Sequence, residues 1–341
     1  MKYNVTIGIP IYNTVDCVQM SLMSALAQTY PSIEFLLVDD GSKDGSLAVV
    51  NRIIQNHNRK DDVRVLIHSE NLGVSVSRNR IIDEAAGEYL FFMDSDDAIA
   101  SNTIELMMQN VRRYNAEIVF GSYEKCEISG KKTLYQYPLL QFMKEDELAS
   151  FAYRKYAGIQ ASSCNFLVKT SILRENQLRF IDTDYWEDLV FTFDLVTYIS
   201  RAVFLPDITY SYKCRMNSLS HYHTRDRISK EEVMKNIKAI NHLKDTTKSL
   251  CKKNYYPNRC FSIAMTDFFI VCNILKLRKV IRPPFNMAEM KSVLDHPSSF
   301  IKICTFRQAF VRNMLLFLLG KLPSFICVWI VWLIGKVKKL I

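Results

Sequence analysis

The stretch GEYLFFMDSDD, residues 87 to 97, runs an apolar segment directly into three carboxylates, Asp94, Asp96 and Asp97. The apolar segment is typical of a strand that is buried on both faces of a parallel sheet. An ionised carboxylate is costly to bury without a partner, and carboxylates this close together repel one another. We therefore expect a cationic group at the end of this strand.

The same pattern of a β-rich run followed by a polar turn recurs along the first 120 residues. The expected strands are VTIGIPI (5–11), IEFLLVD (33–39), VRVLIH (63–68), EYLFFMD (88–94) and EIVFGS (117–122). Helices are expected between them, near residues 16–28, 45–56, 74–86 and 101–113. This alternation predicts a mostly parallel sheet with helices on both faces. In such a sheet, ligands bind at the carboxyl ends of the strands.

Polar, turn-forming sequence follows four of these strands. The four segments are PIYN (10–13), DDGSKDGS (39–46), ENLGVS (70–75) and DSDD (94–97). Because the carboxyl ends of parallel strands meet at one edge of a sheet, we expect these segments to converge. The sequence therefore predicts a ligand site at that edge.

Five motifs in order along the chain carry a resemblance to a known family. They are VTIGIPIYN (5–13), LLVDDGSKDGS (36–46), NLGVSVSRN (71–79), GEYLFFMDSDD (87–97) and WEDLVF (186–191). Together they resemble the inverting nucleotide-sugar glycosyltransferases of family 2, of the bacterial polysaccharide type, over about residues 3 to 220. The resemblance implies an α/β protein with the GT-A fold, a Rossmann-like nucleotide-binding sheet with helices on both faces, followed by a helical C-terminal region.

The resemblance implies a nucleotide site formed by the first three turns. In the family, the second Asp of the pair, here Asp40, accepts the imide N–H of a uracil ring. The residues assigned to nucleotide binding are Pro10, Tyr12, Asn13, Asp40, Asn71, Gly73, Arg78 and Asp94. A helix start after Gly73 would offer free N–H groups to a diphosphate, and Arg78 would be a fixed cation.

Structural alternatives remain open for several of these side chains. Asp39 and Asp40 could simply shape the turn and cap the next helix. Tyr12 could belong to the core, and Arg78 could form an ion pair with Asp39 or Asp94.

The acidic cluster after residue 93 fits a divalent cation, which eases the departure of a diphosphate leaving group. We assign Asp96 as the metal ligand, with Asp94 on the ribose or a metal-bound water and Asp97 in support. An all-oxygen site favours Mg²⁺ or Mn²⁺, whereas zinc would favour His or Cys. Asp97 could in addition cap the following helix.

An inverting transfer needs a base that takes the proton of the acceptor hydroxyl. Asp188 matches the family's base, and Trp186 and Glu187 beside it could contact the sugar or the acceptor. The alternative for Asp188 is a helix N-cap. Further along, Arg215, Ser218 and His221 resemble a segment that closes over the diphosphate, although a solvated role for His221 fits equally well.

Composition limits the other classes of function. The chain has 341 residues and a formal charge of +9, and the surplus of Lys and Arg is concentrated after residue 200. The first part is therefore not a basic platform for nucleic acid. Nine cysteines without a CxxC pair indicate reduced thiols in a cytoplasmic protein, and the N-terminus reads as a strand and not as an export signal.

The sequence predicts three parts: a GT-A catalytic domain (1–225), a helical subdomain (226–306) and a membrane-associating tail (307–341). The tail contains NMLLFLLGKLPSFICVWIVWLIGKVKKLI, in which Lys321 and Pro323 split an apolar stretch into two short pieces. We expect helices that lie at the cytoplasmic face of the membrane, with Trp329 and Trp332 at headgroup depth. One C-terminal span, or a core helix pair or dimer interface, is the alternative.

The expected activity is transfer of a sugar, from a nucleotide-sugar donor of the UDP type, to a saccharide or lipid-linked acceptor in surface polysaccharide biosynthesis. The alternative is a non-catalytic nucleotide-binding or scaffold protein on the same fold. A nucleotidyltransferase is a third reading, but it would be expected to have a Gly-rich basic loop where this chain has IPIYN (9–13). The donor sugar, the linkage and the oligomeric state are not defined by the sequence.

Overall fold

The computed structural model describes residues 2–154, 159, 162–183, 186–215 and 227–341. The chain forms two compact units. The sheet unit comprises Met1–Leu148, Ala161–Asp182 and Phe191–Ser218, and the helical unit comprises Ala149–Gln160, Thr183–Val190 and Leu219–Ile341. The division expected at residues 225 and 306 stays a prediction.

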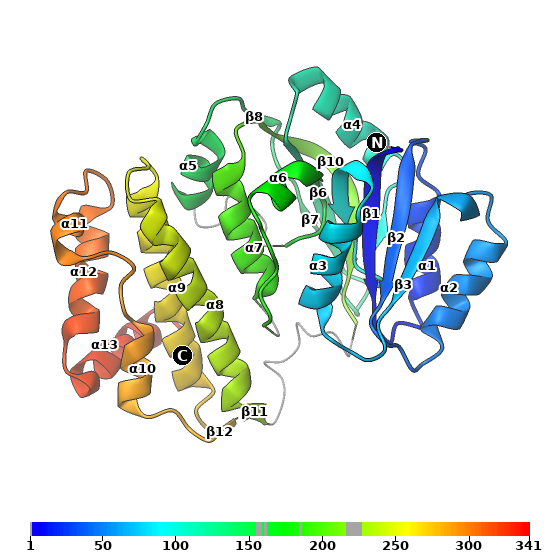
Figure 1. Ribbon diagram of the computed structural model, residues 1–341. Helices are drawn as coiled ribbons and strands as arrows, with labels where there is room; N and C mark the ends of the chain where they lie inside the picture. The colour runs from blue at the N-terminus through cyan, green and yellow to red at the C-terminus, as the bar shows by residue number, and fades with distance from the viewer. Residues whose placement is uncertain (1, 155–158, 160–161, 184–185, 216–226) are drawn as a thin grey trace. The chain divides into compact units, whose positions relative to one another are not determined.

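In the described part of the chain, ten strands form one sheet in the order β3-β2-β1-β4-β9-β6-β10-β5, with β7 paired to β6 and β8 paired to β10 (Figure 1). The strands are β1 (Tyr3–Ile11), β2 (Ile33–Asp39), β3 (Val63–Ile67), β4 (Gly87–Phe92), β5 (Ala98–Ile99), β6 (Ile118–Cys126), β7 (Lys132–Tyr135), β8 (Leu140–Phe142), β9 (Phe166–Lys169) and β10 (Ala202–Lys213). The first four in space, β3, β2, β1 and β4, run parallel. The parallel pairing predicted for the first part of the chain is therefore confirmed for these four strands.

The second half of the sheet is mixed, unlike the mostly parallel sheet that the alternation predicted. β9 lies between β4 and β6 and is antiparallel to both. β10 is parallel to β6 and antiparallel to β5 and β8. The expected strand at 117–122 is present as β6, but β9, which comes 40 residues later in the chain, separates it from β4. Local periodicity carries no information about such an insertion.

Helices cover both faces of the sheet, as expected. In the sheet unit these are α1 (Val18–Leu26), α2 (Ser46–Gln55), η1 (Lys60–Asp62), α3 (Val74–Glu84), α4 (Thr103–Tyr114), α6 (Thr170–Glu175) and η2 (Val196–Tyr198). The chain passes from β1 to β2 to β3 through α1 and α2, and then returns through α3 to β4 on the other side of β1. Because such crossovers are right-handed, this reversal places α3, which packs on β1 and β2, on the face opposite α1 and α2.

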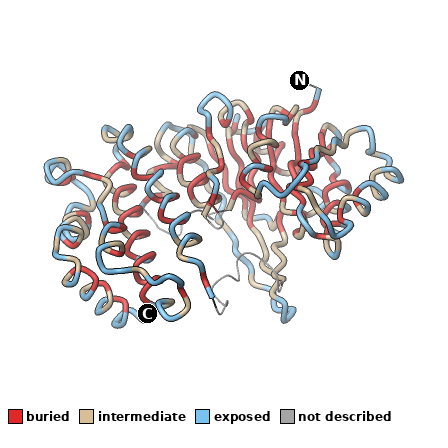
Figure 2. The backbone as a smooth tube through the Cα atoms, turned by 60° about the horizontal axis from the view of Figure 1, so that its bottom comes forward, coloured by how far each residue is buried: buried red, intermediate tan, exposed pale blue. Residues whose placement is uncertain are grey.

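The central strands form the core of the sheet unit and are buried along their lengths (Figure 2). Phe35 on β2 and Phe91 on β4 are fully buried, as is Ile7 on β1 between them. Each such side chain contributes about 1.5–3 kcal/mol relative to an exposed one. The rigid strands therefore end at fixed positions, which is what a binding site at their carboxyl ends requires.

The helical unit is built around α9. Its helices are α8 (Lys230–Ser249), α9 (Tyr256–Lys276), α10 (Met287–Val293), α11 (Phe300–Cys304), α12 (Phe310–Lys321) and α13 (Ser324–Val337), with a short parallel pair, β11 (Ile228–Ser229) and β12 (Ile281–Arg282). Helices α5 (Glu147–Arg154) and α7 (Glu187–Leu195) contribute residues to both units. α9 packs against α8, α10, α12 and α13.

Among the described helices, α9 alone is long and apolar enough to cross a membrane, but 72% of its apolar window is buried inside the structure. That burial is typical of the core helix of a folded domain. The tail expected at 307–341 forms α12 and α13, which meet at Leu322–Pro323. One side of each helix packs on α9, and the opposite side leaves Leu315 and Trp329 exposed.

Candidate active site

The order of the strands places the candidate site at the carboxyl ends of β1, β2 and β4. The chain leaves β1 toward β2 on one side and later reaches β4 on the other, so β1 and β4 flank the point at which the direction of winding reverses. Ligands of doubly wound sheets bind in the crevice at such a point. Asp40 follows β2 and Asp94 follows β4, so the structure brings both acids to this edge.

The three acids after β4 form a tight cluster. Each of Asp94, Asp96 and Asp97 offers an oxygen atom, and these atoms all lie within 4.8 Å of one another. Asp97 is the most buried of the three, with only 1% of its surface exposed. The roles assigned to these three carboxylates stay predictions.

Asp97 is held by β10. The hydroxyl of Tyr210 donates to Asp97 Oδ2 at 2.7 Å, and the backbone N–H of Lys213 donates to Asp97 Oδ1 at 2.8 Å. The same Tyr210 hydroxyl accepts the backbone N–H of Asp94 at 3.2 Å. One buried tyrosine thus fixes the turn that carries the whole cluster. No feature of the local sequence pattern pointed to Tyr210 or Lys213.

The cluster holds more negative charge than its surroundings stabilise. Burial, followed by the charges of Asp94 and Asp96, raises the pKa of Asp97 to about 8. Burial and the charge of Asp94 also raise the pKa of Asp96. Carboxyl groups whose ionised forms are disfavoured in this way favour a nearby cation.

Two arginines supply part of the expected positive charge. Arg78 Nη2 lies 2.9 Å from Asp94 Oδ1, and Arg215 Nε lies 2.6 Å from Asp96 Oδ2. Arg78 is buried on α3, with its guanidinium 5.3 Å from the centre of the Phe180 ring. The pair with Asp94 is one of the two structural alternatives for Arg78, and it leaves the guanidinium at the edge of the sheet where the acids gather.

Asp40 is a buried acceptor that orders the turn after β3. Its Oδ1 accepts the backbone N–H of Leu72 at 3.0 Å, and its Oδ2 accepts the N–H of Gly73 at 2.8 Å. His68 Nδ1 lies 2.7 Å from Oδ1 of the same carboxylate. A carboxylate offers about four acceptor positions, so these three contacts leave room for one further donor. His68 was not identified from the sequence, although it is the last residue of the VRVLIH run.

The other turns at this edge are also built by side chains that the sequence singled out. Asn71 Oδ1 accepts the N–H of Gly73, whose φ of 94° favours glycine. Asn13, with a φ of 49°, accepts the N–H of Lys43 through its Oδ1 at 2.9 Å. Asp39 accepts the N–H of Ser42, which is the turn-shaping role considered for it. Pro10, which was assigned to nucleotide binding, is buried within β1.

Tyr12 is exposed to 44% and is therefore not part of the core. An exposed ring beside the end of β1 remains available for contact with a ligand.

Glu187 and Asp188, the acids proposed to act on the acceptor, lie at the start of α7. Asp188 is the second residue of this helix, so it lies in the first turn and not at the N-cap. The N–H of Val190 binds the carbonyl of Trp186, and Glu187 is buried. Asp188 belongs to the helical unit and the acidic cluster to the sheet unit. The roles of Trp186, Glu187 and Asp188 stay predictions, and Ser218 and His221 lie outside the described residues.

Comparison with known proteins agrees with this architecture. Residues 6–175 match the family described as glycosyl transferase family 2. The glycosyltransferase GlyG of Streptococcus pneumoniae is 33% identical over 230 residues, which cover 64% of this chain and 73% of GlyG. The chain therefore belongs to family 2 of the glycosyltransferases.

Two further proteins are similar to this chain, one in sequence and one in structure. The cholesterol galactosyltransferase of Borreliella burgdorferi is 26% identical over 228 residues, and the match covers 64% of this chain and 62% of that enzyme. The crystal structure of S. aureus TarS in complex with UDP-GlcNAc superposes with a TM-score of 0.65 at 16% identity, covering 93% of this chain and 90% of that one. The superposition confirms the predicted GT-A fold.

The role of Tyr210 can be tested by removing its hydroxyl. Tyr210→Phe should lower the free energy of unfolding by about 1–3 kcal/mol, because a buried oxygen of Asp97 loses a donor. Urea titration measures this difference, with Tyr135→Phe, an exposed tyrosine on β7, as the control that should change little. Equal stability of the two variants would contradict the proposed tie between β10 and the cluster.

Proposed function

We propose that this glycosyltransferase moves a sugar from a UDP-sugar to a saccharide or lipid-linked saccharide acceptor, with inversion at the anomeric carbon, in surface polysaccharide biosynthesis. The observation that carries the proposal is the position of Asp40 and the acidic cluster at the same edge of the sheet, at the carboxyl ends of β2 and β4 on either side of β1. A scaffold protein on this fold would have no need to keep all four of the acids Asp40, Asp94, Asp96 and Asp188 in its sequence.

The buried carboxylate of Asp40 supports a uracil-containing donor. His68 and the N–H groups of Leu72 and Gly73 hold it in place, and its remaining acceptor position suits the imide N–H of the base. A fixed acceptor of this kind rejects a base that lacks the donor, because the carboxylate would then be left partly unsatisfied. The UDP-GlcNAc bound by TarS is consistent with such a donor.

The all-oxygen cluster fits Mg²⁺ or Mn²⁺, with Asp96 as the first ligand and Asp94 and Asp97 in support. When bound, such an ion would neutralise charge on the diphosphate leaving group. Arg215, which already contacts Asp96, lies where its guanidinium could bind a phosphate oxygen, and Arg78 holds Asp94 in position. These five charged side chains, three acids and two arginines, would together bind the metal ion and the diphosphate.

The residues proposed to act on the acceptor lie at or next to the start of α7. Asp188 would take the proton from the acceptor hydroxyl as that oxygen attacks the sugar, and Trp186 would offer a flat apolar surface to the sugar ring. Asp188 lies in the first turn of α7.

A lipid-linked acceptor would place the protein at the cytoplasmic face of the membrane. Exposed apolar side chains on α12 and α13, among them Val311, Leu315 and Trp329, support peripheral binding through the tail. Lys336, Lys338 and Lys339 would add attraction to anionic lipid. The relative named for cholesterol supports an acceptor of lipid character.

The metal assignment predicts that Asp96→Asn weakens donor binding and lowers turnover together, because one charge of the site is lost while its shape is kept. The assay is UDP release from a panel of nucleotide sugars in the presence of Mn²⁺. Asp61→Asn, at an exposed acid on η1, is the matched control and should keep the wild-type rate. Full activity of Asp96→Asn, or of the wild type in excess chelator, would refute a metal at Asp96.

The base assignment predicts a different pattern for Asp188→Asn. The turnover number should fall by roughly 10² or more, while UDP binds with nearly unchanged affinity. Asp182→Asn, at an exposed acid of the same segment, should behave as the wild type. Loss of UDP binding and of thermal stability in Asp188→Asn would instead indicate a structural role for this carboxylate.

A further inference from the structure

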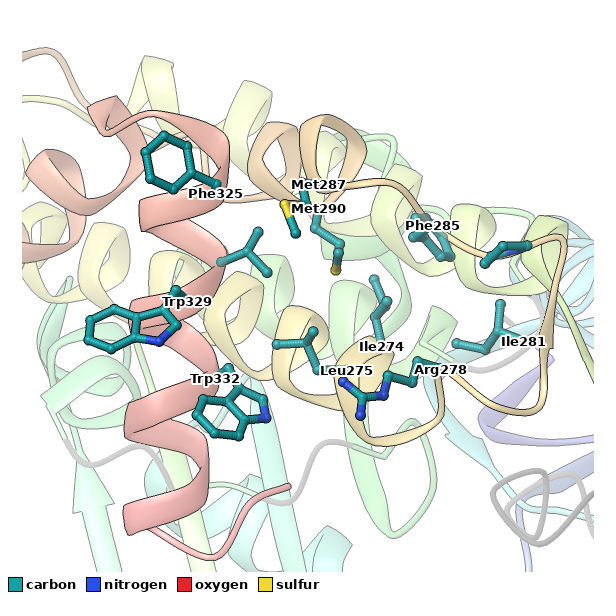
Figure 3. A pocket seen from close by; sticks show the side chains of 12 residues that line it. Ile274, Leu275, Arg278, Ile281, Phe285, Met287, Met290, Phe325, Trp329 and Trp332 are labelled. Carbon is teal, nitrogen blue, oxygen red and sulfur yellow. The ribbon is translucent and has the colours of Figure 1, made fainter.

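An apolar pocket lies within the helical unit, and none of the residues assigned to the reaction lines it. It has a volume of about 840 Å³, is partly open to solvent, and is lined by the C-terminal end of α9, the segment after β12, α10 and α13. Figure 3 shows Trp329 and Trp332 of α13 on one side of the pocket, and Met290 and Ile274 on the other. A volume in the range of roughly 300–1,000 Å³ is typical of pockets that bind small molecules.

The interior of the pocket suits a hydrocarbon chain. Ile274 and Leu275 of α9, Met290 of α10 and Val328 of α13 are buried side chains without a charged atom. Methionine is unbranched and flexible, so it adapts to a chain of varying shape. Burial here would cost a polar ligand its hydrogen bonds to water, whereas burial of an apolar chain is favourable.

The rim of the pocket is cationic. Arg278 is the one charged residue among those that line the described pocket, and it is exposed. The segment KLRKVIRPPFNMA, residues 276–288, carries four basic residues and no carboxylate. The next acid, Glu289, is held at 2.6 Å by Lys230. A ligand that fits both rim and interior combines an anionic group with an apolar chain.

The outer wall of the pocket continues into the exposed apolar surface of the tail. Phe325 and Trp329 line the pocket, yet 63% and 57% of their surfaces are exposed. Leu315 on α12 is also exposed to 63%. Tryptophan prefers the boundary between headgroups and acyl chains, so this surface favours a ligand that arrives from a bilayer.

We propose that the pocket binds the hydrocarbon chain of one anionic phospholipid, with the lipid phosphate against the guanidinium of Arg278. The inference rests on the proposed location at the membrane, and it adds a specific lipid site to general adsorption through the tail. A guanidinium pairs with phosphate through two parallel hydrogen bonds, which a diffuse positive surface does not provide.

The test uses a soluble lipid, because a vesicle surface attracts every cation nearby and would hide the role of one arginine. Dihexanoyl phosphatidylglycerol, kept below its micelle concentration, is titrated into the full chain carrying Trp186→Phe. Only Trp329 and Trp332 then emit, and both line the pocket. We expect a saturable blue shift of their fluorescence, a much weaker response to dihexanoyl phosphatidylcholine, and no displacement by equimolar inorganic phosphate.

Arg278→Glu and Lys279→Glu form a matched pair, since both residues are exposed cations next to each other and only Arg278 lines the pocket. Arg278→Glu should raise the lipid concentration at half-saturation about tenfold or more, and Lys279→Glu should change it by less than about threefold. Met287→Glu, at an exposed position that also lines the pocket, should weaken binding as Arg278→Glu does.

Absence of a saturable response, or equal losses in Arg278→Glu and Lys279→Glu, would overturn the proposal. So would a blue shift that follows protein concentration and a dimer in sedimentation, because a second copy of the chain would then fill the pocket. UDP-sugar hydrolysis by Arg278→Glu in the otherwise native chain should equal that of the wild type. Lipid binding without hydrolysis would refute the proposed function alone, and hydrolysis without lipid binding would refute the pocket alone.

Discussion

The hydrogen bond between Tyr210 and Asp97 is the contact on which the candidate site depends. It joins β10 to the turn after β4, and the same hydroxyl binds the backbone of Asp94. The turn can therefore hold three carboxyl groups within 4.8 Å, although burial and their mutual repulsion raise the pKa of Asp97 to about 8. Arg78 and Arg215 offset part of that repulsion, each from a different segment of the chain. Carboxyl groups crowded in this way favour a nearby cation.

The sequence predicted those parts of the site that local pattern encodes. Apolar runs that end in polar turns located Asp40 and Asp94 at the carboxyl ends of β2 and β4. Arg78 was considered as an ion-pair partner of Asp94, and the structure contains that pair. Two other partners were not predicted because they are distant in sequence: His68 is 28 residues from Asp40, and Tyr210 is 113 residues from Asp97. The insertion of β9 between β4 and β6 was missed for the same reason, since strand order is set by long-range pairing.

The helical unit illustrates the same limit on a larger scale. α9 lies in the region where the sequence predicted a helical subdomain (226–306), and α12 and α13 lie in the predicted tail (307–341). Their packing together with α10 creates the pocket, and no single stretch of sequence contains it. One face of the tail belongs to the core, and the other remains exposed. Core packing and membrane contact, the alternatives considered for the tail, are therefore compatible, because they would use opposite faces of the same helices.

The central claim is that Asp40 and the acidic cluster form one donor site for a UDP-sugar and a divalent ion. The most direct test is a crystal structure with UDP and Mn²⁺, with anomalous scattering measured at the manganese edge. The account predicts a manganese peak in contact with Asp96 and the diphosphate, and a uracil ring whose imide faces Asp40. A uracil bound away from Asp40, or a manganese peak remote from the acids after β4, would contradict it.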